Sequence, residues 1–100
     1  MPYEQVVDIA LADGVIVRYS RSGRPIARYA VVLLVLVDEV WHEARLFDNH
    51  LGNHHMHRYT RSEGKQAPET FHPGPTNAAI AAAIGHLKAH SEAIVESWRN

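Results

Sequence analysis

The sequence predicts an α+β domain in which an antiparallel meander of about five strands packs against one C-terminal amphipathic helix. Over the first 60 positions, short segments rich in Val, Ile and Tyr alternate with turn residues, which is typical of a strand meander. The last quarter of the chain instead carries apolar residues at helical spacing. One hundred residues are enough for one modest core, so we expect residues 1–100 to form a single domain.

Turn residues divide the first part of the chain into three segments. Asp13 and Gly14 suit a two-residue hairpin turn, and residues 22–25 form a second turn signal. The segment after it is too rich in Val to favour a helix. From Tyr29 to Val37 apolar residues occupy both parities, so we expect this central strand to be covered on both faces, by the helix and by a partner or the curled sheet. The predicted strands are residues 3–11, 15–21 and 26–37.

Two more strands and the helix complete the predicted fold. Asp38 and Glu39 reverse the chain, and the loop at residues 48–53 reverses it again. Residues 61–75 contain three prolines, which cannot donate to a strand ladder, so this stretch is predicted to be irregular. Thr76 offers an N-cap for the helix. The strands are predicted at residues 40–47 and 54–60, and the helix at 77–97 with Ile80, Ile84, Leu87, Ile94 and Trp98 on its apolar face.

Composition excludes several classes of function. The chain has no cysteine, which excludes a disulfide framework, a thiolate metal site and a thiol nucleophile. It opens with no basic leader, and its longest apolar run is too short for a membrane span, so we expect a cytoplasmic protein without a membrane partner.

Basic residues gather in two segments, although the net charge is only −1. Such segments indicate a surface that binds phosphate groups, as in RNA, but solvated hairpin tips have the same composition. The residues are Arg18, Arg21, Arg24 and Arg28 in the first segment, and Arg58, Arg61 and Lys65 in the second.

Residues 46–61 contain four of the eight histidines. Residues two apart in a strand share a face, so His55 and His57 are predicted to point one way, with His54 pointing the other. If Phe47 pairs with His54, the preceding strand brings His42 to the face of His55 and His57. A slip by one residue would undo this convergence.

Three interpretations of this cluster stay open. In the first, His55 and His57 cleave RNA as an acid–base pair, with Arg58 or Arg45 nearby, Asp48 orienting an imidazole, and no metal or other cofactor. In the second, zinc or another divalent metal binds three imidazoles, or two together with Asp48. In the third, the histidines are solvated on a polar hairpin. The imidazoles of the metal interpretation are those of His42, His55 and His57.

The pattern Asp48-Asn49-x-x-Gly52-x-x-His55-x-His57, between a buried strand and an Ala-rich helix, resembles the TumE-like toxins of prokaryotic toxin–antitoxin loci and their uncharacterised relatives. The resemblance spans about residues 26–98. It implies a toxin that acts on RNA or the translation machinery and is neutralised by a cognate protein antitoxin. It also implies that the five matched residues form a functional motif, in which His50 has no assigned role.

A different class of function is a non-catalytic interaction module. Here the apolar strand Tyr29–Val37 would build a homodimer or dock a partner. His86 and His90 have a spacing that suits a metal, but they lie off the predicted apolar stripe, and we expect both to be solvated.

Overall fold

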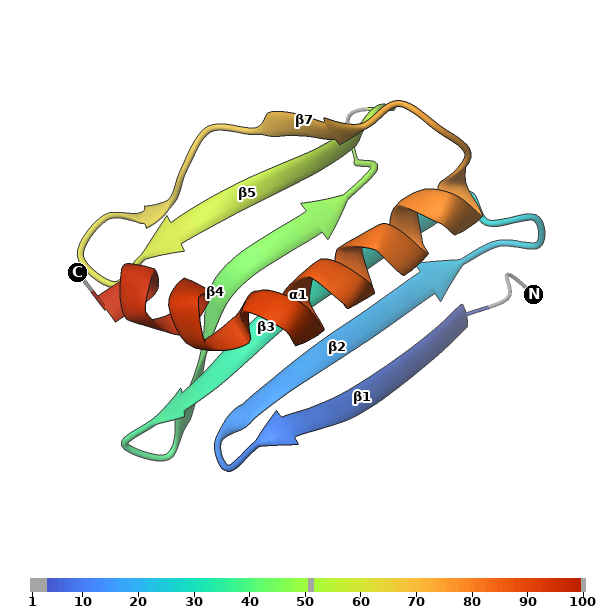
Figure 1. The fold of residues 1–100 in the computed structure, drawn as a ribbon. Helices are drawn as coiled ribbons and strands as arrows, with labels where there is room; N and C mark the ends of the chain where they lie inside the picture. The colour runs from blue at the N-terminus through green and yellow to red at the C-terminus, as the bar shows by residue number, and fades with distance from the viewer. Residues whose placement is uncertain (1–3, 51, 100) are drawn as a thin grey trace.

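The computed structural model describes residues 4–50 and 52–99 as two layers, an antiparallel sheet with one helix across one of its faces (Figure 1). The α+β fold class is therefore confirmed. Tyr3, where the first predicted strand begins, lies outside the described residues. The elements are β1 (Glu4–Ala12), β2 (Val15–Ser22), β3 (Arg28–Val37), β4 (Val40–Asp48), β5 (His54–Thr60), β6 (Gly64–Lys65), β7 (Glu69–His72) and α1 (Thr76–Arg99).

The strands follow one another as neighbours in the order β1-β2-β3-β4-β5-β6, with every pair antiparallel. Tight turns make this possible. Gly14 between β1 and β2 has a φ of 71°, and Asp38 and Glu39 between β3 and β4 have φ values of 51° and 66°. Two successive residues with positive φ are what a two-residue hairpin turn needs to match the twist of its strands.

The stretch predicted to be irregular contains two short strands, β6 and β7, and that prediction was wrong in part. Both strands pair with β5, on the edge that β4 leaves open. Pro68 lies in the gap between them, where no ladder hydrogen bond is required of it. The prolines interrupt this outer strand without preventing it from forming.

Helix α1 packs against the sheet as its apolar spacing predicts. Its first turn is closed by the Ala79 N–H, which donates to the Pro75 carbonyl at 3.0 Å, so the cap falls one residue before the predicted Thr76. The helix departs from helical geometry at His90. Ile84 of the predicted stripe is half-buried, and the buried residues are Ala79, Ile80, Ala83, Leu87, Ile94 and Trp98. No helix within residues 4–50 and 52–99 is both long and apolar enough to cross a membrane.

Strand β3 lies between β2 and β4, so both of its edges are paired. Tyr29, Val31, Leu33 and Val35 are buried in the core with α1. On the opposite face, Glu4 of β1 and Lys65 of β6 line the same cavity. The sheet therefore curls round this second face, which we call the concave face. The helix covers one face of β3, as predicted; on the other face Leu34 is buried and Leu36 is 40% exposed.

Candidate functional site

His55 and His57 share one face of β5, as predicted. Asp48 pairs with His55 and Leu46 with His57, and both pairs lie on the concave face. The register differs by two residues from the expected one, because Phe47 faces Met56 rather than His54. A register shift of two residues leaves every side chain on the same side of the sheet, so His55 and His57 still share a face.

His42 does not join them, which corrects the expected convergence. The ladder of β3 and β4 shifts between Leu33 and Leu34, where Leu33 faces Arg45 and Leu34 faces Glu43. Ala44 is thus an extra residue, and such a bulge reverses the parity of the residues beyond it. The His42 ring lies on the helix side, 5.4 Å from the Trp98 ring.

The predicted set of His42, His55 and His57 therefore spans both faces of the sheet. In the part of the chain that the structure describes, no three His, Asp or Glu side chains are placed to hold a metal ion.

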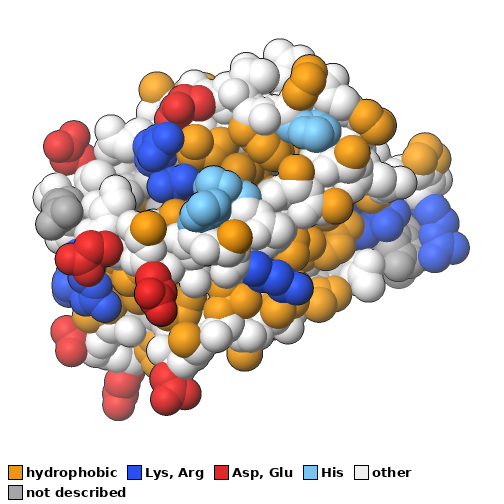
Figure 2. All heavy atoms as spheres, viewed as in Figure 1, with side chains coloured by type: hydrophobic (Ala, Val, Ile, Leu, Met, Phe, Trp, Pro, Cys, Tyr) orange, Lys and Arg blue, Asp and Glu red, His pale blue; other side chains and the backbone are white. Residues whose placement is uncertain are grey.

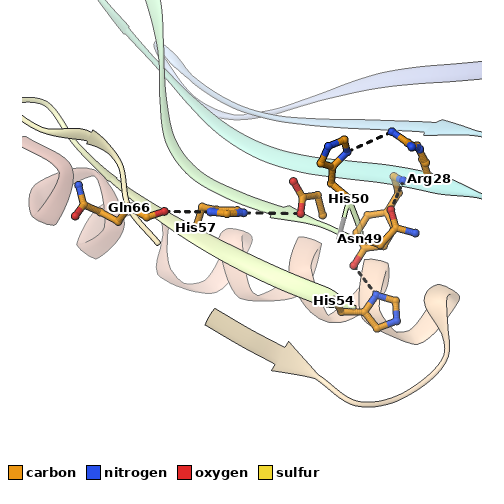
Figure 3. A network of polar contacts seen from close by, with 8 residues as sticks. Arg28, Asn49, His50, His54, His57 and Gln66 are labelled. Carbon is orange, nitrogen blue, oxygen red and sulfur yellow. Dashed lines mark hydrogen bonds and ion pairs between the residues drawn. The ribbon is translucent and has the colours of Figure 1, made fainter. Parts of the chain in front are cut away.

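Asp48 and His57 form the centre of the concave face. Both are buried, with exposed fractions of 8% and 7%. The Gln66 carbonyl lies 3.1 Å from His57 Nδ1 and accepts its hydrogen, which turns Nε2 toward the Asp48 carboxylate (Figure 3). The distance from Nε2 to Asp48 Oδ1 is 4.0 Å, longer than a hydrogen bond. Asp48 Oδ1 and His55 Nδ1 are buried without a hydrogen-bond partner in the structure.

A cavity of about 550 Å³ opens over Asp48. Its charged or titratable lining residues are Glu4, Arg21, Arg28, Tyr29, Asp48, His50 and Lys65. Arg28 donates to His50 Nδ1 at 3.3 Å, so these two side chains lie together at the cavity wall (Figure 3). Neither His55 nor His57 is a lining residue of this cavity. A ligand in the cavity would meet Asp48 and His50, with His57 behind the carboxylate.

Asn49 and His54 have structural roles. The Asn49 amide accepts from the Tyr29 N–H and donates to the Ala27 carbonyl, both at 3.0 Å, and so ties the end of β4 to the start of β3. His54 Nε2 donates to the Gly74 carbonyl at 3.0 Å, and Nδ1 accepts from the Tyr29 hydroxyl at 2.9 Å. Burial, and after it the charge of Asp48, raises the pKa of Tyr29 to about 12, so its hydroxyl stays a donor.

The predicted basic surface is divided between the faces. Arg21, Arg28 and Lys65 line the cavity. Arg18 is on the concave face but forms an ion pair with Asp8 at 2.8 Å, and Arg24 lies in the turn between β2 and β3. On the helix side, Arg58 pairs with Glu69 at 2.9 Å and Arg61 stacks over Trp98 at 5.6 Å.

The proposed acid–base pair was also expected to have Arg58 or Arg45 beside it, which is wrong. Arg45 faces Arg58 across the β4–β5 ladder, and Arg45 is two residues from Phe47, which packs on α1. Both cations therefore lie on the helix side, away from His55 and His57.

Residues 3–100 match the DUF7718 family, which is described as a domain of unknown function. The chain belongs to this family. No curated protein and no solved structure matched the DUF7718 chain. What its site can do therefore has to be argued from its own residues.

The sequence pattern led to Asp48 but not to His50. The pattern assigns no role to His50, which precedes the glycine of the turn and lies outside the alternating pair. The available signal was its position two residues after Asp48, the last residue of β4, which lines the cavity. Its partner Arg28 starts β3, and only the β3–β4 pairing brings the two together.

Proposed function

We propose that this DUF7718 protein binds RNA in the cavity of the concave face and cleaves it by acid–base chemistry without a metal. One observation carries the proposal: Asp48, whose carboxylate is buried with its Oδ1 atom unpaired beside His57, lines a cavity whose wall carries arginine, lysine and histidine. A buried carboxylate with too few donors is costly, and a ligand hydroxyl in the cavity would donate a hydrogen bond to it. RNA offers such a hydroxyl beside a phosphate, at the ribose 2′ position.

In the proposed reaction, Asp48 takes the proton of the 2′-hydroxyl as the 2′ oxygen attacks the neighbouring phosphorus. The bond from phosphorus to the 5′ oxygen breaks, which leaves a 2′,3′-cyclic phosphate and a free 5′-hydroxyl end. His50, released at Nδ1 once Arg28 turns to the phosphate, acts as the general acid and gives a proton to the departing oxygen. Arg28 and Lys65 stabilise the charge that builds on the phosphate oxygens.

His57 is a positioning residue in this scheme, because it contacts the ligand only through Asp48. Its Nδ1–H is fixed by the Gln66 carbonyl, so the ring presents Nε2 to the carboxylate. His55, which faces Asp48 across the ladder, is the second group that sets the carboxylate's surroundings. The histidine pair predicted from sequence thus acts behind the carboxylate rather than as the acid and the base.

The biological setting we propose is that of a toxin neutralised by a protein antitoxin. An RNA substrate would place the protein in the cytoplasm, and an antitoxin that covers the cavity would block it. For the homodimer expected through Tyr29–Val37, both edges of the strand are paired and Leu33 and Val35 are buried under α1, so such a dimer would have to use the opposite face, where Leu36 is 40% exposed. A charge at Leu33 or Val35 would therefore disrupt the core and would not test an interface.

The test is cleavage of a labelled single-stranded RNA in buffer containing EDTA, with the DNA of the same sequence as a second substrate. We expect products ending in a 2′,3′-cyclic phosphate from RNA only. Asp48→Asn and His50→Gln are each expected to lower the rate by about 10²-fold or more. His57→Gln should lower it less.

Two variants serve as controls. Asp8→Asn removes an exposed carboxylate on the same face, and His42→Gln removes a histidine on the helix side. Both are expected to cleave RNA at the rate of the unmodified protein. Equal rates for Asp48→Asn and Asp8→Asn would contradict the proposal, as would cleavage of the DNA.

Expression of the chain alone in bacteria tests the setting separately. We expect arrested growth with the unmodified chain and normal growth with Asp48→Asn at the same protein level. Arrest by both would place the toxicity elsewhere in the molecule.

A further inference from the structure

A second cluster of charges lies on the helix side of the sheet, and the proposed RNA chemistry does not use it. It consists of Arg45 and Arg58, which face each other across β4 and β5, and of His86 and His90 on α1. We call it the helix-side basic cluster. On this face of the molecule, histidine and basic side chains lie beside the helix among apolar atoms (Figure 2).

Arg45 is the unusual member of the cluster. Its exposed fraction is 6%, its Nε atom is buried without a hydrogen-bond partner, and no carboxylate forms an ion pair with it in the described residues. Burial lowers the pKa of Arg45, and the charge of Arg58 lowers it further. A buried guanidinium nitrogen without a hydrogen bond is costly, because that nitrogen has given up water and gained no partner.

The groups around Arg45 add positive charge. Like charges directly opposite in a ladder repel, and Arg58 holds that position. Arg58 is bound through Nε to Glu69, which leaves its terminal nitrogens for another anion. Glu69 is half exposed, and its negative charge acts in the opposite direction by raising the pKa of Arg45.

Helix α1 brings two imidazoles to the same place. The His86 ring lies 5.9 Å from the Phe47 ring and 4.7 Å from the His90 ring. Burial lowers the pKa of His86, and the charges of His90, Arg45 and Arg58 lower it further, so His86 senses the other three groups. Guanidinium groups and imidazoles gathered on one side of a sheet are groups that bind oxyanions.

We propose that the helix-side basic cluster binds a terminal phosphate group, with the guanidinium groups of Arg45 and Arg58 as its main donors and His86 and His90 at its outer side. A phosphate monoester is the class of ligand that fits, because its charge of nearly −2 matches paired guanidinium groups and its oxygens accept several hydrogen bonds. The group can come from free phosphate or from a nucleoside monophosphate. This site is on the opposite side of the sheet from Asp48 and does not depend on the proposed RNA cleavage.

The test is thermal unfolding of the full chain in inorganic phosphate, in adenosine 5′-monophosphate, and in sodium chloride of equal ionic strength. A ligand that binds only the folded protein raises Tm, and at ten times its Kd the rise is about 7 °C for a domain of this size. We expect this rise with phosphate or the nucleotide and not with the chloride. A rise with the nucleotide alone identifies a nucleotide site, and equal rises identify a site for phosphate itself.

Three variants decide whether the cluster is responsible. Arg45→Met replaces the buried cation by an apolar side chain of similar length, and we expect it to fold, to have a higher Tm without phosphate, and to lose the phosphate response. His86→Gln lies on the exposed side of α1 and should reduce the response without affecting folding. Lys88→Gln removes a cation from the same helix outside the cluster, and should keep the full response.

No rise in Tm beyond that in chloride would overturn the proposal, and so would a full response in both Arg45→Met and His86→Gln. If Arg45→Met does not fold, the comparison of His86→Gln with Lys88→Gln decides alone. Because Arg45 and Asp48 serve different faces, loss of the phosphate response leaves RNA cleavage as it was, and loss of cleavage in Asp48→Asn leaves the phosphate response.

Discussion

Replacing Asp48 by Asn should make the protein more stable while it removes the proposed base. The Asp48 carboxylate is 8% exposed, its Oδ1 atom has no hydrogen-bond donor, and the nearest imidazole nitrogen is 4.0 Å away. A buried polar group left unpaired costs about 1–3 kcal/mol. Asn keeps the shape, removes the charge, and adds an N–H that can approach His57 Nε2.

We take the lower end of that range, because Arg28 and Lys65 at the cavity wall partly offset the cost of the carboxylate. The free energy of unfolding should then rise by about 1 kcal/mol, which is about 5 °C in Tm for 100 residues. Urea unfolding at pH 7, followed by far-UV circular dichroism, measures it, and the urea dependence of the free energy should not change.

A free energy of unfolding lower in Asp48→Asn than in the unmodified protein would refute this reasoning, because the carboxylate would then stabilise the native state. Asp8→Asn is the matched control. Its carboxylate is exposed and already accepts two hydrogen bonds from Arg18, so its removal should bring no gain. A gain in stability with Asp48→Asn and none with Asp8→Asn would show that the first carboxylate is kept for a ligand and the second for stability.

Three further predictions follow from packing and backbone geometry. Leu87 on α1 is fully buried, so Leu87→Ala should lower the free energy of unfolding by about 3 kcal/mol in the same urea assay. Gly23 has a φ of 91°, and a Cβ there would lie 2.9 Å from the Ala27 nitrogen, so Gly23→Ala should lower the free energy of unfolding by about 2 kcal/mol. Gly52 has a φ of 90° with open space round it, so Gly52→Ala should lower it by about 1 kcal/mol. Equal losses in the two variants would contradict the steric argument. The raised pKa of Tyr29, about 12 when folded and 10.0 as its ordinary value, means that the unfolded chain loses this proton first as pH rises. Stability should therefore be full below pH 10 and fall between about pH 10 and pH 12, and Tyr29→Phe should show a smaller fall when urea unfolding is repeated across that range.

The strands and the helix were predictable because their signals are local. The Asp13-Gly14 turn, the Val-rich β3 and the apolar spacing of α1 each act within a few residues, and the structure has all three where the sequence indicates. The strands β6 and β7 were missed because nothing in the Pro-rich stretch favours a strand by itself. They form because β5 offers an open edge, which is a tertiary cause.

The candidate site was predictable only in part, for the same reason. The period of two placed His55 and His57 on one face, and Asp48 with them. It failed for His42 because one extra residue at Ala44 reverses the parity of β4. No local sequence pattern predicts such a bulge. Arg28 and His50 are about twenty residues apart in the chain, and only the pairing of β3 with β4 brings them into contact.

Strand β4 supplies a buried charge to each face of the sheet. Asp48 points to the concave face and Arg45, three residues earlier, points to the helix side. The two charges are opposite in sign, yet they do not neutralise each other by contact, because the sheet lies between them. Each one leaves a buried polar atom without a hydrogen bond, a state that native proteins rarely keep without a reason. The simplest reason is that each charge meets its partner only when a ligand is bound: a hydroxyl on the Asp48 side and a phosphate on the Arg45 side. Since either ligand would relieve a cost that is present in the free protein, the same two positions are where substitution should raise stability and remove binding together.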